Sequence, residues 1–444
     1  MQKKVAFSTL GCKVNQYDTQ AMLEFFLASG YKLVDDYQDA NVYVVNTCTV
    51  TQAGEKKSLQ LIRRCRRNNP DAHVIVTGCL AQRRSNALSN TGARLIIGTQ
   101  RRSEVVELLE QAISDNSQII AVEDLVNTPF ETLNITSHEG HTRAIMKIQE
   151  GCNYKCTYCI IPSVRGPIRS RSLEDIKKEA TALAQAGYTE IILTGIHLTS
   201  YGKDYTEKIQ LIDAIETVCD IEGIERVRIG SLEPSIITEE FVKRLSLKHK
   251  VCPQFHLALQ SGCDSVLRRM KRRYTTSTFT KATNIIRDYY PKAAFTTDLI
   301  VGFPGETDEE FDETLEFIKK IKFSKIHVFP YSIREGTPAA TMPNQLSKSI
   351  KHERVRKVIA VEATLSETYR NSFINTESEV LVEELNHDGL FVGYTPTYIP
   401  VIIDDGAVGQ IVKVSLTGLT EEGFIGQVVS KTIQLEISNK FLEV

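Results

Sequence analysis

Short apolar runs alternate with helical stretches through most of this chain, and that order constrains the fold most strongly. The first candidate strands and helices are 4–11, 18–30, 42–47, 55–67 and 73–78. A β-α-β order makes consecutive strands parallel, because the chain crosses the sheet through each helix. We therefore expect an α/β protein whose N-terminal domain, 1–135, is a Rossmann-like parallel sheet covered by helices.

A second β-α series occupies 142–375. Its six candidate strands are 144–149, 190–195, 226–231, 254–259, 295–302 and 325–330. Six units are fewer than the eight of a closed barrel, so a partial (β/α)6 barrel is expected. In such barrels functional groups gather at the carboxyl ends of the strands. The stretch 341–375 has the pattern of a polar helical tail.

The segment 376–444 changes to five short strands separated by glycine and aspartate, which is typical of a small β-barrel. It holds 11 acidic and 3 basic residues. Repulsion from phosphate would oppose broad contact of this barrel with a nucleic-acid backbone. Several roles of the barrel stay open. It could contact a nucleic acid through a small basic face, contact only a base, or close over the site. It could also serve only in packing or solubility.

The remaining bulk properties are those of an ordinary globular protein. The chain has 444 residues, a net charge of −2 and no uninterrupted run of 18 apolar residues, so no membrane span is expected. The N-terminus lacks the apolar core and cleavage site of a signal peptide, which favours a cytoplasmic location. Ten cysteines there are more typical of metal ligands or reduced core thiols than of disulfides. We expect a monomer.

Three cysteines directly follow three of the predicted strands. Cys12, Cys48 and Cys79 end the stretches STLGC, VVNTC and IVTGC. The carboxyl ends of parallel strands lie along one edge of a sheet, so these thiols should converge on one spot. The alternative is three buried cysteines without a ligand, since cysteine is often found in protein cores.

A second cysteine group stands in EGCNYKCTYCI, directly after the first predicted barrel strand. Cys152, Cys156 and Cys159 have the spacing C-x3-C-x2-C. A zinc ribbon would need a second pair, and a thioredoxin-type site uses two cysteines. Three thiolates suit a [4Fe–4S] cluster with one iron that has no protein ligand. Such an open position is typical of a catalytic metal centre.

The motif around Tyr158 resembles that of the radical S-adenosylmethionine (SAM) enzymes. The resemblance implies that the open iron chelates the amino and carboxylate groups of SAM. It also implies that one electron from the cluster splits SAM into a 5′-deoxyadenosyl radical. Such a radical suits an aromatic C–H bond, which offers acid–base or nucleophilic catalysis neither an acidic proton nor a leaving group.

The resemblance extends over nearly the whole chain to the methylthiotransferases. It rests on TLGCKVNQYDT, VVNTCTV and VTGC in the first domain and on HLALQSG, DLIVGFPGET and FPYSIREGTPAA in the second. It implies a second [4Fe–4S] cluster on Cys12, Cys48 and Cys79, whose open iron carries sulfur to the substrate. A second SAM per turnover would supply the methyl group. The C-terminal barrel is similar to the TRAM module of this family.

The stretch GCKVNQYDT resembles the branch that acts on N6-threonylcarbamoyladenosine (t6A) in tRNA, next to the anticodon at position 37. The product would be the 2-methylthio derivative. Sister branches that modify isopentenyladenosine in tRNA or a ribosomal-protein aspartate are alternatives, and a non-enzymatic iron–sulfur protein that binds RNA is disfavoured. An electron donor of flavodoxin or ferredoxin type is expected, and the sulfur donor stays open.

Arginine runs favour an RNA partner over a protein. The candidate phosphate contacts are Arg66, Arg67, Arg272 and Arg273, although a basic run is often only a solvated helix face.

Further SAM contacts are placed by analogy with the family. Thr194 and Gly195 occupy the position of the family's Gly-Gly-Glu motif, although the carboxylate is missing here. Glu233, Gln260 and Asp298 stand at strand ends and could line the barrel mouth or serve as structural hydrogen-bonding groups. The other four cysteines lack cluster spacing and are expected in the core: Cys65, Cys219, Cys252 and Cys263.

Overall fold

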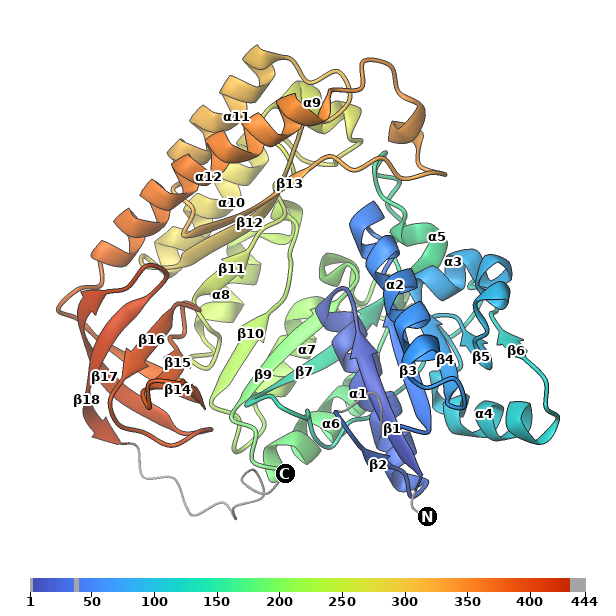
Figure 1. Ribbon diagram of the computed structural model, residues 1–444. Coiled ribbons are helices and arrows are strands. Elements are labelled where there is room, and N and C mark those ends of the chain that lie inside the picture. The colour runs from blue at the N-terminus through green and yellow to red at the C-terminus, as the bar shows by residue number, and fades with distance from the viewer. Residues whose placement is uncertain (1–2, 36–39, 432–444) are drawn as a thin grey trace.

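The computed structural model describes residues 3–35 and 40–431 (Figure 1). Its first domain is a six-stranded parallel sheet in the order β2-β1-β3-β4-β5-β6, which confirms the predicted parallel sheet and adds β2, β5 and β6 to the three predicted strands. The strands are β1 (Lys4–Thr9), β2 (Lys32–Leu33), β3 (Val42–Thr47), β4 (His73–Gly78), β5 (Leu95–Ile97) and β6 (Ile119–Ala121). Every residue of β3 is buried, because helices cover both faces of the sheet.

Two apolar clusters occupy the two faces of this sheet. One joins the sheet to α2 (Gln52–Asn68) and α3 (Cys79–Leu88) through Ile62, Cys65 and Leu80. The other joins it to α1 (Lys13–Ala28) and α4 (Val105–Ser114). Helix α1 begins five residues earlier than the sequence predicted, directly after Cys12, so this cysteine is the N-cap residue.

The second domain contains all six predicted barrel strands. They are β7 (Arg143–Glu150), β9 (Glu190–Gly195), β10 (Arg226–Ile229), β11 (Gln254–His256), β12 (Ala294–Val301) and β13 (Lys325–Pro330). Two sheets, β10-β9-β7 and β11-β12-β13, are parallel throughout and are joined by bridges such as Leu232 with Leu257. The result is an open arc, which confirms the partial barrel. The short β8 (Arg169–Ser170) pairs antiparallel with β7.

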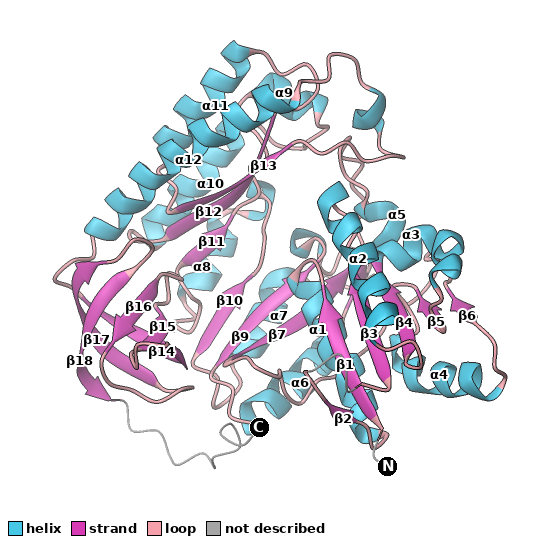
Figure 2. Ribbon diagram, in the orientation of Figure 1, coloured by secondary structure: helices cyan, strands magenta, loops and turns pink. Residues whose placement is uncertain are grey.

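Helices cover the outside of this arc (Figure 2). They are α6 (Leu173–Gln185), α7 (Leu211–Cys219), α8 (Glu239–Ser246), α9 (Asp264–Arg269), α10 (Thr276–Tyr289), α11 (Asp308–Ile321) and α12 (Lys348–Asn371), whereas the short α5 (Ile161–Arg165) lies against α3 of the first domain. Short 3-10 turns are Ser89–Thr91, Arg102–Glu104, Leu198–Ser200, Pro234–Ile236 and Pro338–Thr341. Local sequence sets several helix starts: at the start of α11 the Thr307 hydroxyl accepts a hydrogen bond from the Glu310 amide, and the Glu310 carboxylate accepts one from the Thr307 amide.

The third part is a closed five-stranded barrel in the order β14-β15-β16-β18-β17, as the short strands predicted. Its strands are β14 (Glu377–Leu385), β15 (Phe391–Tyr394), β16 (Pro400–Ile403), β17 (Ile411–Leu419) and β18 (Phe424–Lys431). It packs on the amino ends of the neighbouring parallel strands, where Arg143 of β7 pairs with Glu383 at 2.6 Å. No helix of the described residues is long and apolar enough to cross a membrane.

The N-terminal sheet lies beside the partial barrel, and α1 forms the contact between them (Figure 1). Tyr17 and Ala21 of α1 belong to the apolar core of the barrel, whereas Met22 and Phe26 belong to the core of the first sheet. One helix therefore has buried residues on two faces and contributes to the cores of both domains. This arrangement sets the carboxyl ends of the first sheet next to the mouth of the barrel.

Candidate functional site

The first cysteine group lies where the N-terminal strands end. Cys12 precedes α1, Cys48 follows β3, and Cys79 is the first residue of α3. The loops touch: a Cβ at Gly11 would lie 3.4 Å from the Cys48 sulfur. The φ of Gly11 is 112°, in the left-handed region that suits glycine, so this close approach needs the residue found there.

The three sulfurs of this group are close enough to influence each other's titration. Burial, followed by the nearby Cys12 and Cys48 thiolates, raises the pKa of Cys79 to about 11, while Arg165 opposes that shift. Burial also raises the pKa of Cys48, with a further contribution from Cys12. Like-charged thiolates without a cation between them destabilise one another, so a positively charged centre would be stabilised here.

The second cysteine group forms a loop that starts directly after β7. Cys156 is buried, and Cys152 and Cys159 are partly exposed. The Tyr154 amide points at the Cys152 sulfur at 3.4 Å, and the Arg272 guanidinium donates to the Cys156 sulfur at 3.2 Å. Burial and the two neighbouring thiolates raise the pKa of Cys159 to about 12. Hydrogen-bond donors aimed at sulfur suit cysteines that serve as thiolate ligands.

The two groups fit clusters better than single ions. In the parts of the chain that the structure describes, no three His, Cys, Asp or Glu side chains are arranged to hold one metal ion. The thiolates of a [4Fe–4S] cluster bind different irons and therefore stand farther apart than the ligands of a single ion. Each group supplies three thiols from separate loop positions, which fits a cluster with one open iron.

The residues predicted to contact SAM differ from one another in their surroundings. Glu233 forms a buried ion pair with Arg272, and its carboxylate also lies 3.5 Å from His197 Nε2. Gln260 has a φ of 65°, and its backbone amide donates to the Asp298 carbonyl at 2.9 Å. Their backbones are thereby held together at the strand ends. Tyr158 is packed in an apolar cluster, 3.4 Å from Arg272.

A cavity of about 1160 Å³ opens where the three parts of the chain meet. Cys12 and Lys13 line it from the first domain, Thr194 and Asp298 from the barrel, and Tyr398 from the C-terminal barrel. Its size suits a nucleotide or a similar ligand, and pockets of this kind commonly lie at domain junctions. Cys12 of the first cysteine group and three of the predicted SAM residues, Thr194, Gly195 and Asp298, therefore border one chamber.

The four predicted arginine contacts separate in the structure. Arg67 lies with Lys57, Arg63 and Arg64 around a surface hollow of about 490 Å³ beside Leu10. Arg66 lies in the same helix but turns toward the Pro70 carbonyl, to which it donates at 3.4 Å.

The other two arginines lie at the barrel mouth. Arg273 is exposed and stacks over the Tyr154 ring at 4.1 Å. Arg272 points inward, and its side chain is only 7% exposed, so it faces the cysteines instead of an outer RNA surface.

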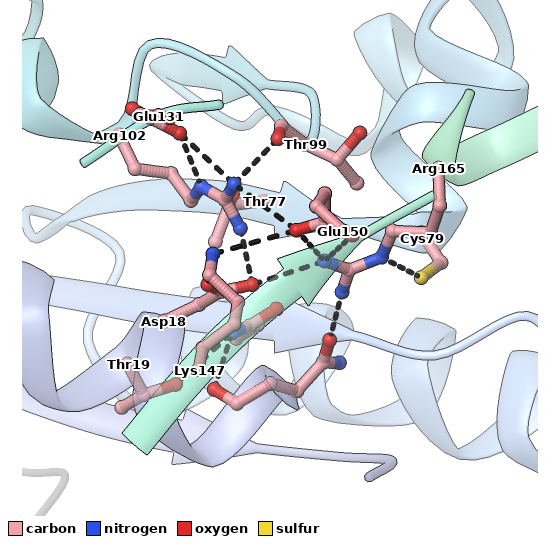
Figure 3. Close-up of polar contacts among 12 residues, drawn as sticks. Asp18, Thr19, Thr77, Cys79, Thr99, Arg102, Glu131, Lys147, Glu150 and Arg165 are labelled. Atoms are coloured by element: carbon pink, nitrogen blue, oxygen red, sulfur yellow. Dashed lines mark hydrogen bonds and ion pairs between the residues drawn. The ribbon is translucent and has the colours of Figure 1, made fainter. Parts of the chain in front are cut away.

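The sequence interpretation missed a buried charge network between the domains (Figure 3). Asp18 of α1 accepts from Lys147 at 2.5 Å and from Arg165 at 3.1 Å, and it also pairs with Arg102. Glu150 accepts from the same Arg165 at 3.1 Å. Arg165 stands in the stretch RGPIRSR, whose local sequence contains no sign of these partners.

Comparison with known proteins agrees with this architecture. The Radical SAM superfamily matches residues 146–318, the uncharacterized protein family UPF0004 matches 4–98, and the TRAM domain matches 371–429. The Bacillus subtilis protein named threonylcarbamoyladenosine tRNA methylthiotransferase MtaB is 43% identical over 93% of each chain. Its namesake from Thermotoga maritima is 36% identical over 95% of this chain and 96% of its own length.

This chain belongs to the radical SAM methylthiotransferases. A further relative, tRNA-2-methylthio-N(6)-dimethylallyladenosine synthase of Pelotomaculum thermopropionicum, is 34% identical over 94% of this chain and 95% of its own. Membership of the radical SAM methylthiotransferases makes the protein an enzyme and implies SAM and a [4Fe–4S] cluster as cofactors.

The fold also matches a solved structure from outside this group. The radical SAM methyltransferase TsrM from Kitasatospora setae has a TM-score of 0.57 at 15% identity, over 77% of each chain. That match concerns the fold alone.

The four cysteines outside the two groups are buried, as expected for core thiols. They are Cys65, Cys219, Cys252 and Cys263.

Proposed function

We propose that this enzyme inserts a methylthio group at carbon 2 of t6A at position 37 of tRNA. The observation that carries the proposal is the pair of three-thiol groups, which are connected through Arg165. This residue ends the short helix that follows Cys159, and its Nε donates to the Cys79 sulfur at 3.2 Å. Two relatives that match over nearly the full length are named for this activity.

Each cysteine group has a separate task in this proposal. Cys152, Cys156 and Cys159 would hold the cluster that binds SAM, and Cys12, Cys48 and Cys79 would hold a second [4Fe–4S] cluster for sulfur. When bound, SAM and the reduced cluster supply one-electron chemistry that activates an aromatic C–H bond. Two SAM molecules would be consumed per turnover, one of them as the methyl donor.

Residues of the barrel mouth would bind and orient SAM. Thr194 and Gly195 end β9 at the cavity, and the Glu233–Arg272 pair lies beside Cys156. The Glu233 side chain is only 3% exposed and ion-paired, so it can keep a fixed position next to the ligand. An electron donor of flavodoxin or ferredoxin type, a cytoplasmic location and a monomeric state stay predictions.

The choice of t6A over isopentenyladenosine depends on a carboxylate that only t6A carries. The N6 substituent and carbon 2 lie on the same edge of the adenine ring, on either side of N1. A cation that binds the carboxylate should therefore stand close to the sulfur-bearing cluster. Lys13 is adjacent to Cys12 and lines the same cavity.

Lys13 differs from the other cations of this cavity. Arg228 pairs with Glu190 at 2.8 Å, Lys325 lies 3.5 Å from Glu362, and Arg370 donates to three backbone carbonyls. Across residues 3–35 and 40–431, Lys13 has neither a hydrogen bond nor an ion pair in the structure. Its ammonium group is therefore available for a carboxylate of the substrate, and this supports the t6A branch.

Replacement of Lys13 by alanine is expected to lower methylthiolation of a t6A-containing anticodon stem-loop by about 10- to 100-fold, the value of a lost hydrogen bond to a charged group. Activity on the analogue in which the threonyl carboxylate is an amide should change little. Product formation by mass spectrometry provides the measurement. Lys325→Ala is the matched control, since its ammonium already has a partner. An equal loss on both substrates would contradict carboxylate recognition.

The basic end of α2 is proposed to contact tRNA phosphates. The double variant Arg66→Glu and Arg67→Glu is expected to weaken tRNA binding and to reduce the slope of log affinity against log salt by about one per lost contact. Filter binding at several salt concentrations measures this. The control is the double variant Lys319→Glu and Lys320→Glu, which makes the same charge change in the last turn of α11, a helix of the barrel domain. If both variants changed the slope equally, the α2 surface would have no specific role.

Nucleoside analysis decides between the substrates. Digested tRNA from a strain that lacks this gene should contain t6A without the methylthio group, and the modification should return with the gene. Persistence of 2-methylthio-t6A in the deletion strain would reject the assignment. Loss of the methylthio group from isopentenyladenosine instead would select the sister branch.

A further inference from the structure

We propose that Arg165 is a positioning residue that couples the two cysteine groups and raises the reduction potential of the cluster held by Cys12, Cys48 and Cys79. This inference rests on the proposed second cluster. The residue belongs to the barrel, yet its side chain reaches the sulfur of a cysteine in the first domain, 86 positions away along the chain.

Each nitrogen of the Arg165 guanidinium has its own partner (Figure 3). Nε donates to the Cys79 sulfur at 3.2 Å, and Nη1 donates to Asp18 and Glu150, both at 3.1 Å. Nη2 donates to the Asn15 side-chain oxygen. The side chain is fully buried, so these contacts are not exchanged for water. A planar guanidinium with all three nitrogens engaged cannot rotate without breaking several hydrogen bonds.

The backbone of Arg165 is tied to both ends of the second cysteine loop. Helix α5 connects it to Cys159, and only five residues lie between the two. On the other side, the Cys152 amide donates to the Gly166 carbonyl at 3.0 Å. A displacement of this cysteine loop must therefore move Arg165, and with it the guanidinium that contacts the Cys79 sulfur.

The surrounding acids keep Arg165 in place. Asp18 and Asn15 are on α1, the helix that begins directly after Cys12, and Glu150 ends β7 two residues before Cys152. The guanidinium thus bridges the helix behind one cysteine group and the strand in front of the other. Neither acid touches a cysteine in the hydrogen bonds of the described residues, so within this cluster of charges only Arg165 contacts a cysteine sulfur.

The contact with sulfur has an electronic consequence. A hydrogen bond and a positive charge next to a ligand sulfur stabilise the more negative, reduced state of an iron–sulfur cluster. Arg165 should therefore raise the reduction potential of the cluster on the first group. Cys156 has an equivalent donor in Arg272, so each group has one arginine directed at one sulfur.

The test compares Arg165→Lys and Arg165→Met in the reconstituted full-length enzyme. A lysine keeps the positive charge but cannot donate to the Cys79 sulfur, the two acids and Asn15 at the same time. A methionine removes both the charge and these hydrogen bonds. Redox titrations followed by electron paramagnetic resonance report the potential of each cluster, because added SAM alters only the signal of the cluster that binds it. Iron content, SAM cleavage and methylthio insertion are measured on the same samples.

Arg171→Lys is the matched control. Arg171 is also fully buried, comes from the same segment and pairs with Glu179 at 2.7 Å, and it lies 3.4 Å from Tyr17 of α1. It has no contact with a cysteine sulfur among the hydrogen bonds of the described residues. This variant therefore measures the effect of altering a buried arginine at the domain interface when no contact with sulfur is lost.

In Arg165→Met we expect the reduction potential of the cluster on Cys12, Cys48 and Cys79 to fall, and methylthio insertion to decrease at least tenfold. Tenfold is the lower end of the effect of removing a group that hydrogen-bonds to a metal ligand. Arg165→Lys should show a smaller shift and a similar loss. SAM cleavage should stay close to that of the wild type. An unchanged potential in both variants, or the same shift in Arg171→Lys, would overturn the inference.

The proposed function fails in a different way. Wild-type enzyme with about four irons per chain after reconstitution, instead of about eight, would remove the second cluster altogether. In that case there would be no second redox signal to shift. A second signal that does not depend on Arg165 leaves the proposed function in place and rejects only the role of this arginine.

Discussion

Replacement of Cys79 by alanine is expected to abolish methylthio insertion while reductive cleavage of SAM to 5′-deoxyadenosine continues. Cys79 lies in the first group, and the three cysteines of the loop after β7 are unchanged in this variant. Its sulfur accepts from Arg165, so the substitution also leaves a buried guanidinium without one of its partners. We expect insertion to fall below detection, because a cluster with two protein ligands is not retained stably.

Iron analysis separates this expectation from general damage. The wild type should contain about eight irons per chain from two [4Fe–4S] clusters, and the variant about four. Cys65→Ala is the control, since Cys65 is a fully buried cysteine of α2 that belongs to neither group. If SAM cleavage disappeared together with insertion in Cys79→Ala, the division of tasks between the groups would be wrong. Unchanged iron content would remove Cys79 from the ligands.

Replacement of Asp18 by alanine is expected to destabilise the protein by about 3 to 5 kcal/mol, the cost of removing one partner from a buried ion pair. Three cations, Arg102, Lys147 and Arg165, share this one carboxylate, and all four side chains are at most 1% exposed. The substitution leaves their charges poorly compensated away from water. Chemical denaturation of the apoprotein, followed by circular dichroism, measures the change in the free energy of unfolding.

A partly exposed ion pair provides the comparison. Asp213 pairs with Arg244 at 2.7 Å, but both side chains are about one third exposed. Asp213→Ala should cost about 1 kcal/mol or less, because water screens the pair in the native protein and solvates the remaining charge. Similar losses in Asp18→Ala and Asp213→Ala would show that the buried network is solvated or does not form.

The same network gives the stability a pH dependence of known sign. Burial by itself would raise the pKa of Asp18, but the charges of Arg102, Lys147 and Arg165 lower it well below its ordinary value of 3.8. A carboxyl whose pKa is depressed by folding stabilises the native state above its unfolded pKa. This contribution is complete above about pH 4 and is lost as the pH falls below that value. Asp18→Asn should therefore have a flatter acid denaturation profile than the wild type.

Local sequence patterns were sufficient for much of the fold. The period of apolar residues predicted all six barrel strands, three strands of the parallel first sheet and the strands of the closed C-terminal barrel. A buried strand needs a continuous apolar run, and a cap such as Thr307 with Glu310 marks a helix start within four residues. The early start of α1 was missed because Lys13–Tyr17 are more polar than the helix that follows.

The sequence by itself determined the order of the elements and the positions of both cysteine groups, since each cysteine follows a strand in its own stretch of chain. Only the tertiary structure decided what surrounds the sulfurs. Asp18 and Arg165 are 147 residues apart, Arg272 and Cys156 are 116 apart, and neither pair has a local pattern. Such contacts arise because α1 packs between two domains and buries charges that must then find partners. That choice is made by packing, and no short stretch of sequence contains it.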